Sequence, residues 1–265
     1  MKLAITGKGG VGKTTLTALL SRAFAAEGQT VLAIDADPDG NLASAMGIPL
    51  EQASRIVPIA EMDDLIEERT GAKPGTVGGY FRLNPRVDDI PDRFSITKDG
   101  VKLLVLGTVK TGGGGCICPE SAILKALMSH LLVERSEVVV MDMEAGVEHL
   151  GRATAQAVDA FIVVVEPGRR SLQTAESVRK LAQDIGIAQC YVVGNKMRSE
   201  AERHFVADNL SAFQVLGFLS YNPKFIDADY QGVSVYDMEP QAVKEIKAIK
   251  TRLEEIVRGR KKAHR

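Results

Sequence analysis

The fold is decided by the stretch Gly7-Lys8-Gly9-Gly10-Val11-Gly12-Lys13-Thr14, which satisfies the pattern G-x-x-x-x-G-K-[ST] of phosphate-binding loops. Residues 2–6 before it read as a strand, and residues 14–26 after it have the spacing of a helix. The glycines let successive backbone N–H groups curl around phosphate oxygens, at the positive end of the following helix. The stretch therefore predicts a P-loop between a strand and a helix.

Two side chains of this loop carry most of its predicted chemistry. Lys13 is expected to neutralise charge on the β- and γ-phosphates and to be essential for catalysis, and the Thr14 hydroxyl is expected in the Mg²⁺ shell. The expected nucleotide contacts are Gly9, Gly10, Val11, Gly12, Lys13, Thr14 and Thr15.

The rest of the chain alternates short β-rich runs with longer helical segments, which predicts an α/β fold: a single P-loop NTPase domain, a mostly parallel sheet with helices on both faces. We expect this domain over residues 1–257, with a possible irregular insertion at 51–98 and a disordered basic tail at 258–265. The other expected strands are 30–35, 101–106, 138–142, 161–165, 191–194 and 215–219, and the other expected helices are 120–133, 172–185, 200–209 and 241–257.

Composition narrows the class of protein. The 265 residues are 45% hydrophobic and 25% charged, which excludes a disordered or fibrous chain. The net charge of −1 offers no general attraction to nucleic acid or to an acidic membrane surface. No apolar run approaches the roughly 18 residues that a membrane span needs. The N-terminus has no apolar signal core, and three cysteines cannot build a disulfide framework, so we expect a reducing cytoplasm.

The type of base can be argued from Asn195-Lys196-Met197-Arg198, which follows an expected strand. A GTPase with the N-K-x-D motif would have a carboxylate at position 198, because guanine presents N–H donors there. Arg198 provides no such acceptor, so we expect ATP, with the Asn195 amide facing the exocyclic group of adenine. Backbone atoms near Ser220 and Tyr221 are expected to complete the pocket.

Lys8 adds a second cation to the loop, and here the sequence resembles the deviant-Walker-A ATPases, the superfamily of MinD, ParA and the nitrogenase iron protein. The resemblance implies a homodimer with its nucleotides at the subunit interface, and Lys8 reaching the partner's phosphates. An ordinary solvated surface lysine is the alternative reading of Lys8.

Two acidic stretches agree with this resemblance. Asp35-Ala36-Asp37-Pro38-Asp39 resembles the D-x-D-P switch I of the superfamily, and its period of two places Asp35 and Asp37 on one side of the chain. The resemblance makes Asp37 the candidate for positioning the attacking water and contacting Mg²⁺, with Asp35 nearer the sheet. Asp142, at the end of a buried strand, is expected to hold Mg²⁺ through water. The alternative is that such aspartates only form turns or helix caps.

A second function, metal binding, is predicted for the stretch Gly112-Gly113-Gly114-Gly115-Cys116-Ile117-Cys118-Pro119. Pro119 suits the first position of a helix, which makes Cys118 its N-cap, where the thiolate that binds metal is favoured. Each chain offers two thiolates and a closed soft-metal site needs four, so a dimer sharing this loop would complete one. One alternative is that these cysteines are only small buried hydrophobic residues, which is our interpretation of Cys190. Another is that the pair forms a strained redox disulfide.

In two places the sequence resembles the CooC-type ATPases that mature nickel carbon monoxide dehydrogenase. These are the cysteine pair and the run Asp142-Met143-Glu144-Ala145-Gly146-Val147-Glu148-His149-Leu150-Gly151-Arg152. The resemblance implies Ni²⁺ or Zn²⁺ held between subunits by Cys116 and Cys118, and ATP-driven delivery of nickel to that enzyme or to the related acetyl-CoA synthase. His149 is a candidate auxiliary ligand or partner contact, or else an ordinary hydrogen-bonded switch residue.

Three other functions compete with this one. A positioning or partition ATPase would need a membrane helix or a DNA-binding face, and we expect the apolar stripe of the last helix to pack on the sheet instead. An electron-transfer protein of the nitrogenase iron-protein type would draw cysteines from two loops, but residues 142–152 contain none. A nickel GTPase is disfavoured by Arg198.

Overall fold

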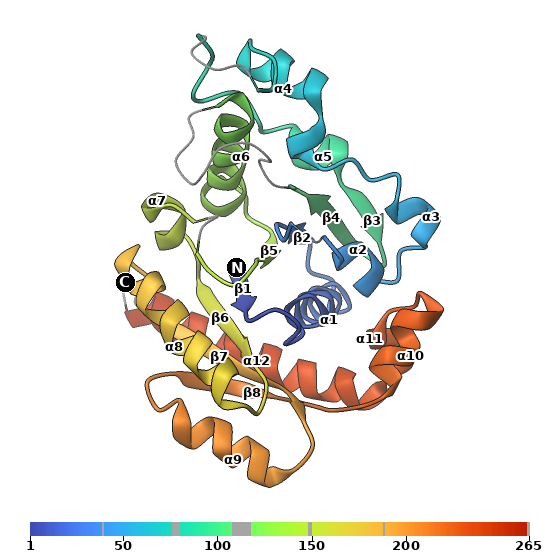
Figure 1. Cartoon of the computed structure of the whole chain (residues 1–265), viewed down its shortest axis with the longest axis vertical. Helices are drawn as coiled ribbons and strands as arrows, with labels where there is room; N and C mark the ends of the chain where they lie inside the picture. The colour runs from blue at the N-terminus through green and yellow to red at the C-terminus, as the bar shows by residue number, and fades with distance from the viewer. Residues whose placement is uncertain (39, 76–79, 108–117, 148–149, 188, 264–265) are drawn as a thin grey trace.

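A computed structural model describes residues 1–38, 40–75, 80–107, 118–147, 150–187 and 189–263. The strands found there form one sheet and are β1 (Lys2–Gly7), β2 (Val31–Asp35), β3 (Ile96–Lys98), β4 (Val101–Val105), β5 (Val138–Asp142), β6 (Ala160–Val165), β7 (Cys190–Met197) and β8 (Gln214–Ser220). Their order is β3-β4-β2-β5-β1-β6-β7-β8 (Figure 1), and only the β3–β4 pair is antiparallel. This arrangement confirms the predicted α/β fold.

Helices cover both faces of the sheet (Figure 1). They are α1 (Lys13–Ala25), α2 (Leu42–Ala45), α3 (Leu50–Ala53), α4 (Asp63–Thr70), α5 (Ile90–Phe94), α6 (Pro119–Ser129), α7 (Arg152–Gln156), α8 (Arg169–Asp184), α9 (Glu200–Asn209), α10 (Lys224–Gln231), α11 (Val235–Met238) and α12 (Pro240–Ala263), with a 3₁₀ turn η1 (Ile59–Glu61) and a π-helical turn η2 (His130–Glu134).

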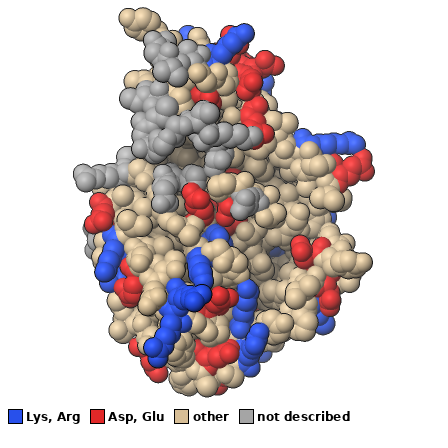
Figure 2. Space-filling model, viewed as in Figure 1, with Lys and Arg blue, Asp and Glu red and all other residues tan. Residues whose placement is uncertain are grey.

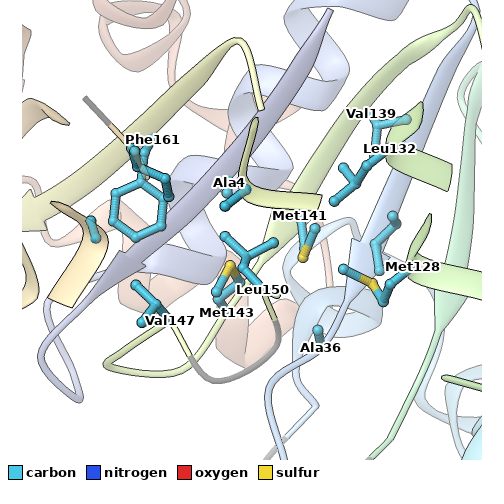
Figure 3. Packing of buried hydrophobic residues seen from close by; sticks show 14 of the residues in the cluster. Ala4, Ala36, Met128, Leu132, Val139, Met141, Met143, Val147, Leu150 and Phe161 are labelled. Carbon is cyan, nitrogen blue, oxygen red and sulfur yellow. The ribbon is translucent and has the colours of Figure 1, made fainter. Parts of the chain in front are cut away.

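Each central strand serves two hydrophobic cores, because successive side chains point to opposite faces of a sheet. Leu3 and Ile5 of β1 lie in the core beneath α1 and α12, whereas Ala4 lies in the core beneath α6, α8 and α9. Figure 3 shows the second core at close range, where Met128 lies near Met141 of β5. Burial on both faces explains why the central strands are continuous apolar runs.

Two regions differ from the sequence expectation. Residues 51–98 contain α4, α5 and the edge strand β3, and Ile66 and Ile90 are fully buried in the core, so this region is part of the domain's packing. The last helix continues to Ala263, beyond the expected domain end at 257. There Arg260 Nη1 donates a hydrogen bond to the Asp159 carbonyl oxygen at 3.0 Å. None of the helices in the described ranges has the length and apolarity that crossing a bilayer requires.

The carboxyl ends of the parallel strands gather the predicted site residues. Asp142 at the end of β5 is in register with Asp35 of β2 on one side and with Ile5 of β1 on the other. Residues 8–12 leave β1 at this edge and lead into α1. Ligands of open parallel sheets bind at this edge, so the topology alone brings separate sequence motifs to one place.

Candidate nucleotide site

The loop between β1 and α1 has the backbone that the P-loop pattern predicts. Gly12 has φ +95°, and a Cβ atom there would lie 2.1 Å from Nδ2 of Asn195. Both the left-handed conformation and the close approach therefore require glycine at this position. The helical hydrogen bonds of α1 begin with the Leu16 N–H donating to the Gly12 carbonyl at 3.0 Å, which leaves the preceding N–H groups at the helix start for an anion.

Lys13 and Asp37 meet in front of this loop. The Lys13 Nζ atom lies 3.6 Å from Asp37 Oδ2, and Lys13 is buried while Asp37 is partly exposed. The structure thus brings together a predicted phosphate-binding cation and the predicted water-positioning carboxylate, from α1 and the segment after β2.

Asp35 shapes the segment that carries Asp37. Its Oδ2 accepts a hydrogen bond from the Leu42 backbone N–H at 3.0 Å, and its Oδ1 accepts one from the Asp37 N–H at 3.3 Å. Burial raises the pKa of Asp35 to about 6, although the two N–H donors oppose this shift. Asp35 therefore lies nearer the sheet than Asp37, as expected, and supports the loop.

Asp142 is the buried acid of the site. Both of its carboxylate oxygens are inaccessible to solvent and have no hydrogen-bond partner of regular geometry. Burial raises the pKa of Asp142 to about 7, and the charges of Asp35 and Asp37 raise it further, whereas Thr14 and Lys13 favour the charged form. A buried carboxylate beside the Thr14 hydroxyl fits Mg²⁺, which prefers oxygen ligands and keeps several waters.

Thr6 connects β1 to the segment after β5, a role that the sequence analysis missed. Its hydroxyl donates to the Glu144 carbonyl oxygen at 2.6 Å and accepts from the Gly146 N–H at 3.2 Å. Met143 and Val147 of this segment are buried in the same core as α6 (Figure 3). The segment is therefore tied to β1 by Thr6 and buried in the hydrophobic core to which α6 also contributes.

A cavity of about 540 Å³ opens beside the loop, within the size range of small-molecule sites. Its floor is formed by the P-loop and the start of α1, and its walls come from the ends of β7 and β8, from Glu166 after β6 and from α10. Lining residues include Gly10, Gly12, Thr15, Asn195, Lys196, Arg198, Ser220, Tyr221, Phe225 and Ile226. The predicted base-pocket residues thus surround one cavity, and α10 was not foreseen.

Asn195 borders this cavity, but its amide is engaged differently from our expectation. Its Nδ2 donates to the Val11 carbonyl oxygen at 2.8 Å, and its Oδ1 accepts from the Lys196 N–H at 2.8 Å. The side chain fastens the P-loop to β7, and a contact with the exocyclic group of adenine stays a prediction. A lone Asn after a strand carries no signal that separates these two roles.

Charged side chains frame the cavity around Asn195. The Lys196 ammonium donates to the Gly10 carbonyl oxygen at 2.6 Å and lies 3.5 Å from Glu166 Oε2. The Arg198 guanidinium lies over the Tyr221 ring, 4.8 Å from its centroid. Position 198 thus carries a stacked cation where a guanine-binding carboxylate would stand.

Lys8 is partly exposed, and among the described residues its ammonium forms no salt bridge. The Lys8 carbonyl oxygen accepts a hydrogen bond from the Val11 N–H at 3.3 Å, which closes the turn of the loop. Its cation therefore remains available, in contrast to that of Lys13.

Of the two cysteines predicted to bind Ni²⁺ or Zn²⁺, Cys118 is described and Cys116 lies outside the described residues, as does the candidate auxiliary ligand His149. Cys118 is the N-cap of α6 and Pro119 is the first helical residue, which confirms the predicted helix start; Cys118 is 7% exposed. Within the described ranges, no group of three or more His, Cys, Asp or Glu side chains is arranged to hold a metal. Cys190 is buried in the core as expected, and burial raises the pKa of its thiol to about 11.

Comparison with known proteins agrees with this geometry. A family model described as the CobQ/CobB/MinD/ParA nucleotide binding domain matches residues 2–235. The carbon monoxide dehydrogenase accessory protein CooC of Rhodospirillum rubrum is 50% identical over 240 residues, 91% of each chain. An uncharacterized ATP-binding protein of Methanocaldococcus jannaschii is 44% identical over 252 residues, 94% of this chain and 96% of the relative.

Solved structures show the same fold. The MinC:MinD cell division protein complex of Aquifex aeolicus contains a chain that matches with a TM-score of 0.68 and 23% identity, over 96% of each chain. The residues that the family model matches include the P-loop, both acidic stretches and the cysteine pair. The chain therefore belongs to the CobQ/CobB/MinD/ParA nucleotide-binding family, and within it to the CooC-type ATPases.

Proposed function

We propose that this ATPase closes as a homodimer around Mg·ATP, holds Ni²⁺ or Zn²⁺ with Cys116 and Cys118, and delivers nickel to carbon monoxide dehydrogenase or the related acetyl-CoA synthase. The observation that carries the proposal is the 50% identity, over 91% of both chains, to CooC, which is named as an accessory protein of carbon monoxide dehydrogenase. We expect the protein to act in the cytoplasm.

The phosphate chemistry follows from the two lysines of the P-loop. Lys13, at the start of α1, leaves Asp37 and binds the β- and γ-phosphates of ATP in its own chain. Lys8, whose ammonium has no salt bridge among the described residues, reaches the phosphates of the partner chain. The two cations together neutralise the charge that develops as the γ-phosphate leaves.

Hydrolysis requires a water molecule aligned with the γ-phosphorus. Asp37, released from Lys13, accepts a hydrogen bond from this water, whose oxygen bonds to phosphorus as the bond to the bridging oxygen breaks. The proton that the water loses passes to an oxygen of the phosphate product. Thr14, Asp37 and Asp142 are the residues that would hold Mg²⁺, some of them through water, and the ion would neutralise charge on the β- and γ-phosphates. Asn195 and the surrounding cavity bind the adenine.

The metal is the cargo, and α6 presents one of its ligands. Cys118 lies at the N-terminus of α6, where the helix dipole favours a thiolate. Two thiolates per chain do not close a site, so two chains together supply four. Metal binding and dimerisation are then linked, because each favours the other.

The contacts of the segment after β5 suggest how nucleotide and metal communicate. Thr6 holds Gly146 beside the phosphate loop, while Met143 and Val147 pack in the core beneath α6. Movement of this segment when the γ-phosphate is bound or lost would shift α6 and therefore Cys118. Closing of the dimer would then change the metal geometry.

The positioning ATPases remain the main alternative, and α12 argues against a membrane role for this chain. Ile246, Ile249 and Leu253, the apolar stripe of that helix, are buried in the core shared with α1, as expected from the sequence. In addition, Figure 2 shows Lys and Arg mixed with Asp and Glu over the viewed face.

Anaerobic purification followed by metal analysis and sizing, with and without a non-hydrolysable ATP analogue, tests the proposal. One Ni²⁺ or Zn²⁺ per two chains, in a species of dimer size, is the expected result. Four irons per dimer with a brown colour would instead identify an iron–sulfur protein, and no metal in either state would exclude a cargo role.

A further inference from the structure

Glu245 of α12, the helix that packs along β8 (Figure 1), binds a residue of the nucleotide cavity. Its Oε2 accepts a hydrogen bond from the Ser220 backbone N–H at 2.9 Å, and its Oε1 accepts one from the Ser220 hydroxyl at 2.6 Å. The Glu245 side chain is 12% exposed, and Ser220 lines the cavity beside the P-loop. A largely buried carboxylate outside the cavity thus holds both hydrogen-bond donors of a residue that lines it.

The Ser220 hydroxyl is fixed from a second side by α9. Arg203 Nη2 donates to Ser220 Oγ at 3.0 Å and lies 3.9 Å from Glu245 Oε1. A serine hydroxyl has one proton, and here this proton is donated to Glu245 while the oxygen accepts from Arg203. Both donors of Ser220 are therefore engaged within the protein.

Neighbouring donors at the ends of β7 and β8 are also engaged within the protein. The Tyr221 backbone N–H donates to the Met197 carbonyl oxygen at 2.8 Å. The Asn195 amide and the Lys196 ammonium donate to carbonyl oxygens of the P-loop at 2.8 and 2.6 Å. The Arg198 guanidinium is stacked on the Tyr221 ring. These contacts direct the donors of this wall toward the protein and leave oxygen lone pairs for a base.

Purine bases differ in what they need from such a wall. Adenine carries an amino group at position 6, which donates hydrogen bonds, whereas guanine and hypoxanthine carry an oxygen there, which accepts them. An oxygen that is buried against this wall without a donor loses its hydrogen bonds to water and gains none in return. A wall whose donors are already engaged therefore favours adenine.

We propose that Glu245 is a positioning residue that gives the nucleotide site part of its preference for adenine. By engaging the N–H and the hydroxyl of Ser220, it withholds the donors that the oxygen of a 6-oxo purine would use. This inference rests on the proposed binding of adenine in the cavity and specifies how the base is selected. It adds to the argument from Arg198, which concerns the N1–H and the 2-amino group of guanine.

ITP is the probe for this inference, because it differs from ATP in having an oxygen at position 6 and a proton on N1. Competition of each nucleotide against a fluorescent ATP analogue, with the full-length protein and Mg²⁺, gives the ratio of the two affinities. The wild type should prefer ATP by about tenfold or more. Glu245→Ala should shift the ratio toward ITP by about three- to tenfold, the effect of one hydrogen bond, since the released donors of Ser220 can bind the oxygen.

Three further variants separate this role from a contribution to folding. Glu255→Ala, at an exposed position of the same helix, should keep the wild-type ratio. Adding Ser220→Ala to Glu245→Ala should reverse part of the shift, because the hydroxyl is one of the two released donors. Glu245→Gln keeps one acceptor oxygen and the shape of the side chain, so its ratio should lie between those of the wild type and Glu245→Ala. Melting temperatures report on the fold of each variant.

The outcomes distinguish this inference from the proposed adenine site. If Glu245 served the fold alone, Glu245→Ala would weaken ATP and ITP together, and an unchanged ratio would overturn the inference. Equal affinity of the wild type for ITP and ATP would also overturn it, because another group such as Arg198 would then supply the donor. Tripolyphosphate, which has no base, tests the site itself: if the wild type bound it as tightly as ATP, the proposed binding of adenine would fail.

Discussion

The ammonium of Lys13 and the carboxylate of Asp37 form an ion pair, with 3.6 Å between Nζ and Oδ2. The cation proposed to bind phosphate and the carboxylate proposed to position water are thus partners of each other before ATP binds. In the proposed mechanism, phosphate oxygens compete with Asp37 for Lys13, so nucleotide binding breaks this ion pair as it engages the lysine. The proposed mechanism therefore links ATP binding and the assembly of the hydrolytic site through this one contact.

Replacing Asp37 with Ala should leave ATP binding intact or strengthen it, because the competitor for Lys13 is removed. Hydrolysis should fall by about 10²-fold or more, since the water loses its acceptor. Sizing after incubation with Mg·ATP should show a long-lived dimer. Asp184→Ala, an exposed position at the end of α8, is the matched control. Unchanged turnover in Asp37→Ala would remove this residue from the mechanism.

The two lysines of the P-loop should separate binding from closure. Lys13→Ala should abolish nucleotide binding, because the phosphates lose the cation of their own chain. Lys8→Ala should bind ATP nearly as the wild type does, yet fail to dimerise with ATP and hydrolyse it slowly. Calorimetric titration and sizing measure the two effects, with Lys244→Ala on the exposed side of α12 as control. Wild-type behaviour of Lys8→Ala in both assays would contradict its action on the partner chain.

The raised pKa values of Asp35, about 6, and Asp142, about 7, predict how stability changes with pH. The folded state binds more protons than the unfolded state between about pH 4 and pH 7. The contribution of these groups to the free energy of unfolding therefore falls as pH rises through this range. Nucleotide-free Asp142→Asn should consequently melt at a higher temperature than the wild type at pH 7.5, by a stabilisation on the order of 1–3 kcal/mol.

The same variant should lose Mg²⁺-dependent hydrolysis, because its amide is a poorer partner for the hydrated ion. The advantage in melting temperature should shrink at pH 5, where the wild-type carboxyl is already protonated. Thermal melting at both pH values checks this, and a variant that is less stable at pH 7.5 would show that the buried charge of Asp142 is compensated in the free protein.

Much of the fold could be predicted because its central strands are buried on both faces. The run at 138–142 is apolar up to its final aspartate, and the structure ends β5 at that residue. The start of α6 was predictable for a local reason, since Pro119 favours the first helical position. Short elements such as α10 and the edge strand β3 lack a long apolar period, and contacts with distant parts of the chain decide them.

The residues that form the site could be predicted better than the contacts that these residues make. Glycine at position 12 is a local requirement of the loop, but the amide of Asn195 that approaches it comes from β7. The Glu120 side chain of α6 likewise accepts a hydrogen bond from the backbone N–H of Gly75, which is distant in the sequence. Sequence motifs indicate which side chains matter, whereas pairings across the sheet determine what each side chain is free to bind.

The choice of ATP over GTP should depend on residue 198. Arg198→Asp introduces a carboxylate that can accept from the guanine N–H groups, so GTP should gain affinity relative to ATP. Arg198→Ala removes the guanidinium charge and its stacking on Tyr221 without adding an acceptor, and it serves as the control. Competition of each nucleotide against a fluorescent ATP analogue measures the ratio. Equal competition by GTP and ATP in the wild type would contradict the assignment of adenine.

The central claim is that two chains share one thiolate metal site. Anaerobic titration of the full-length wild type and of Cys118→Ser with Ni²⁺ and with Zn²⁺, followed by sizing, tests it most directly. The wild type should bind one metal per two chains and become dimeric without nucleotide, and a chelator should reverse this. Cys118→Ser should lose most of its metal affinity and stay monomeric while still binding ATP, since the P-loop is separate from α6. Equal binding of one metal per chain by both proteins would contradict a shared thiolate site and, with it, the delivery of nickel.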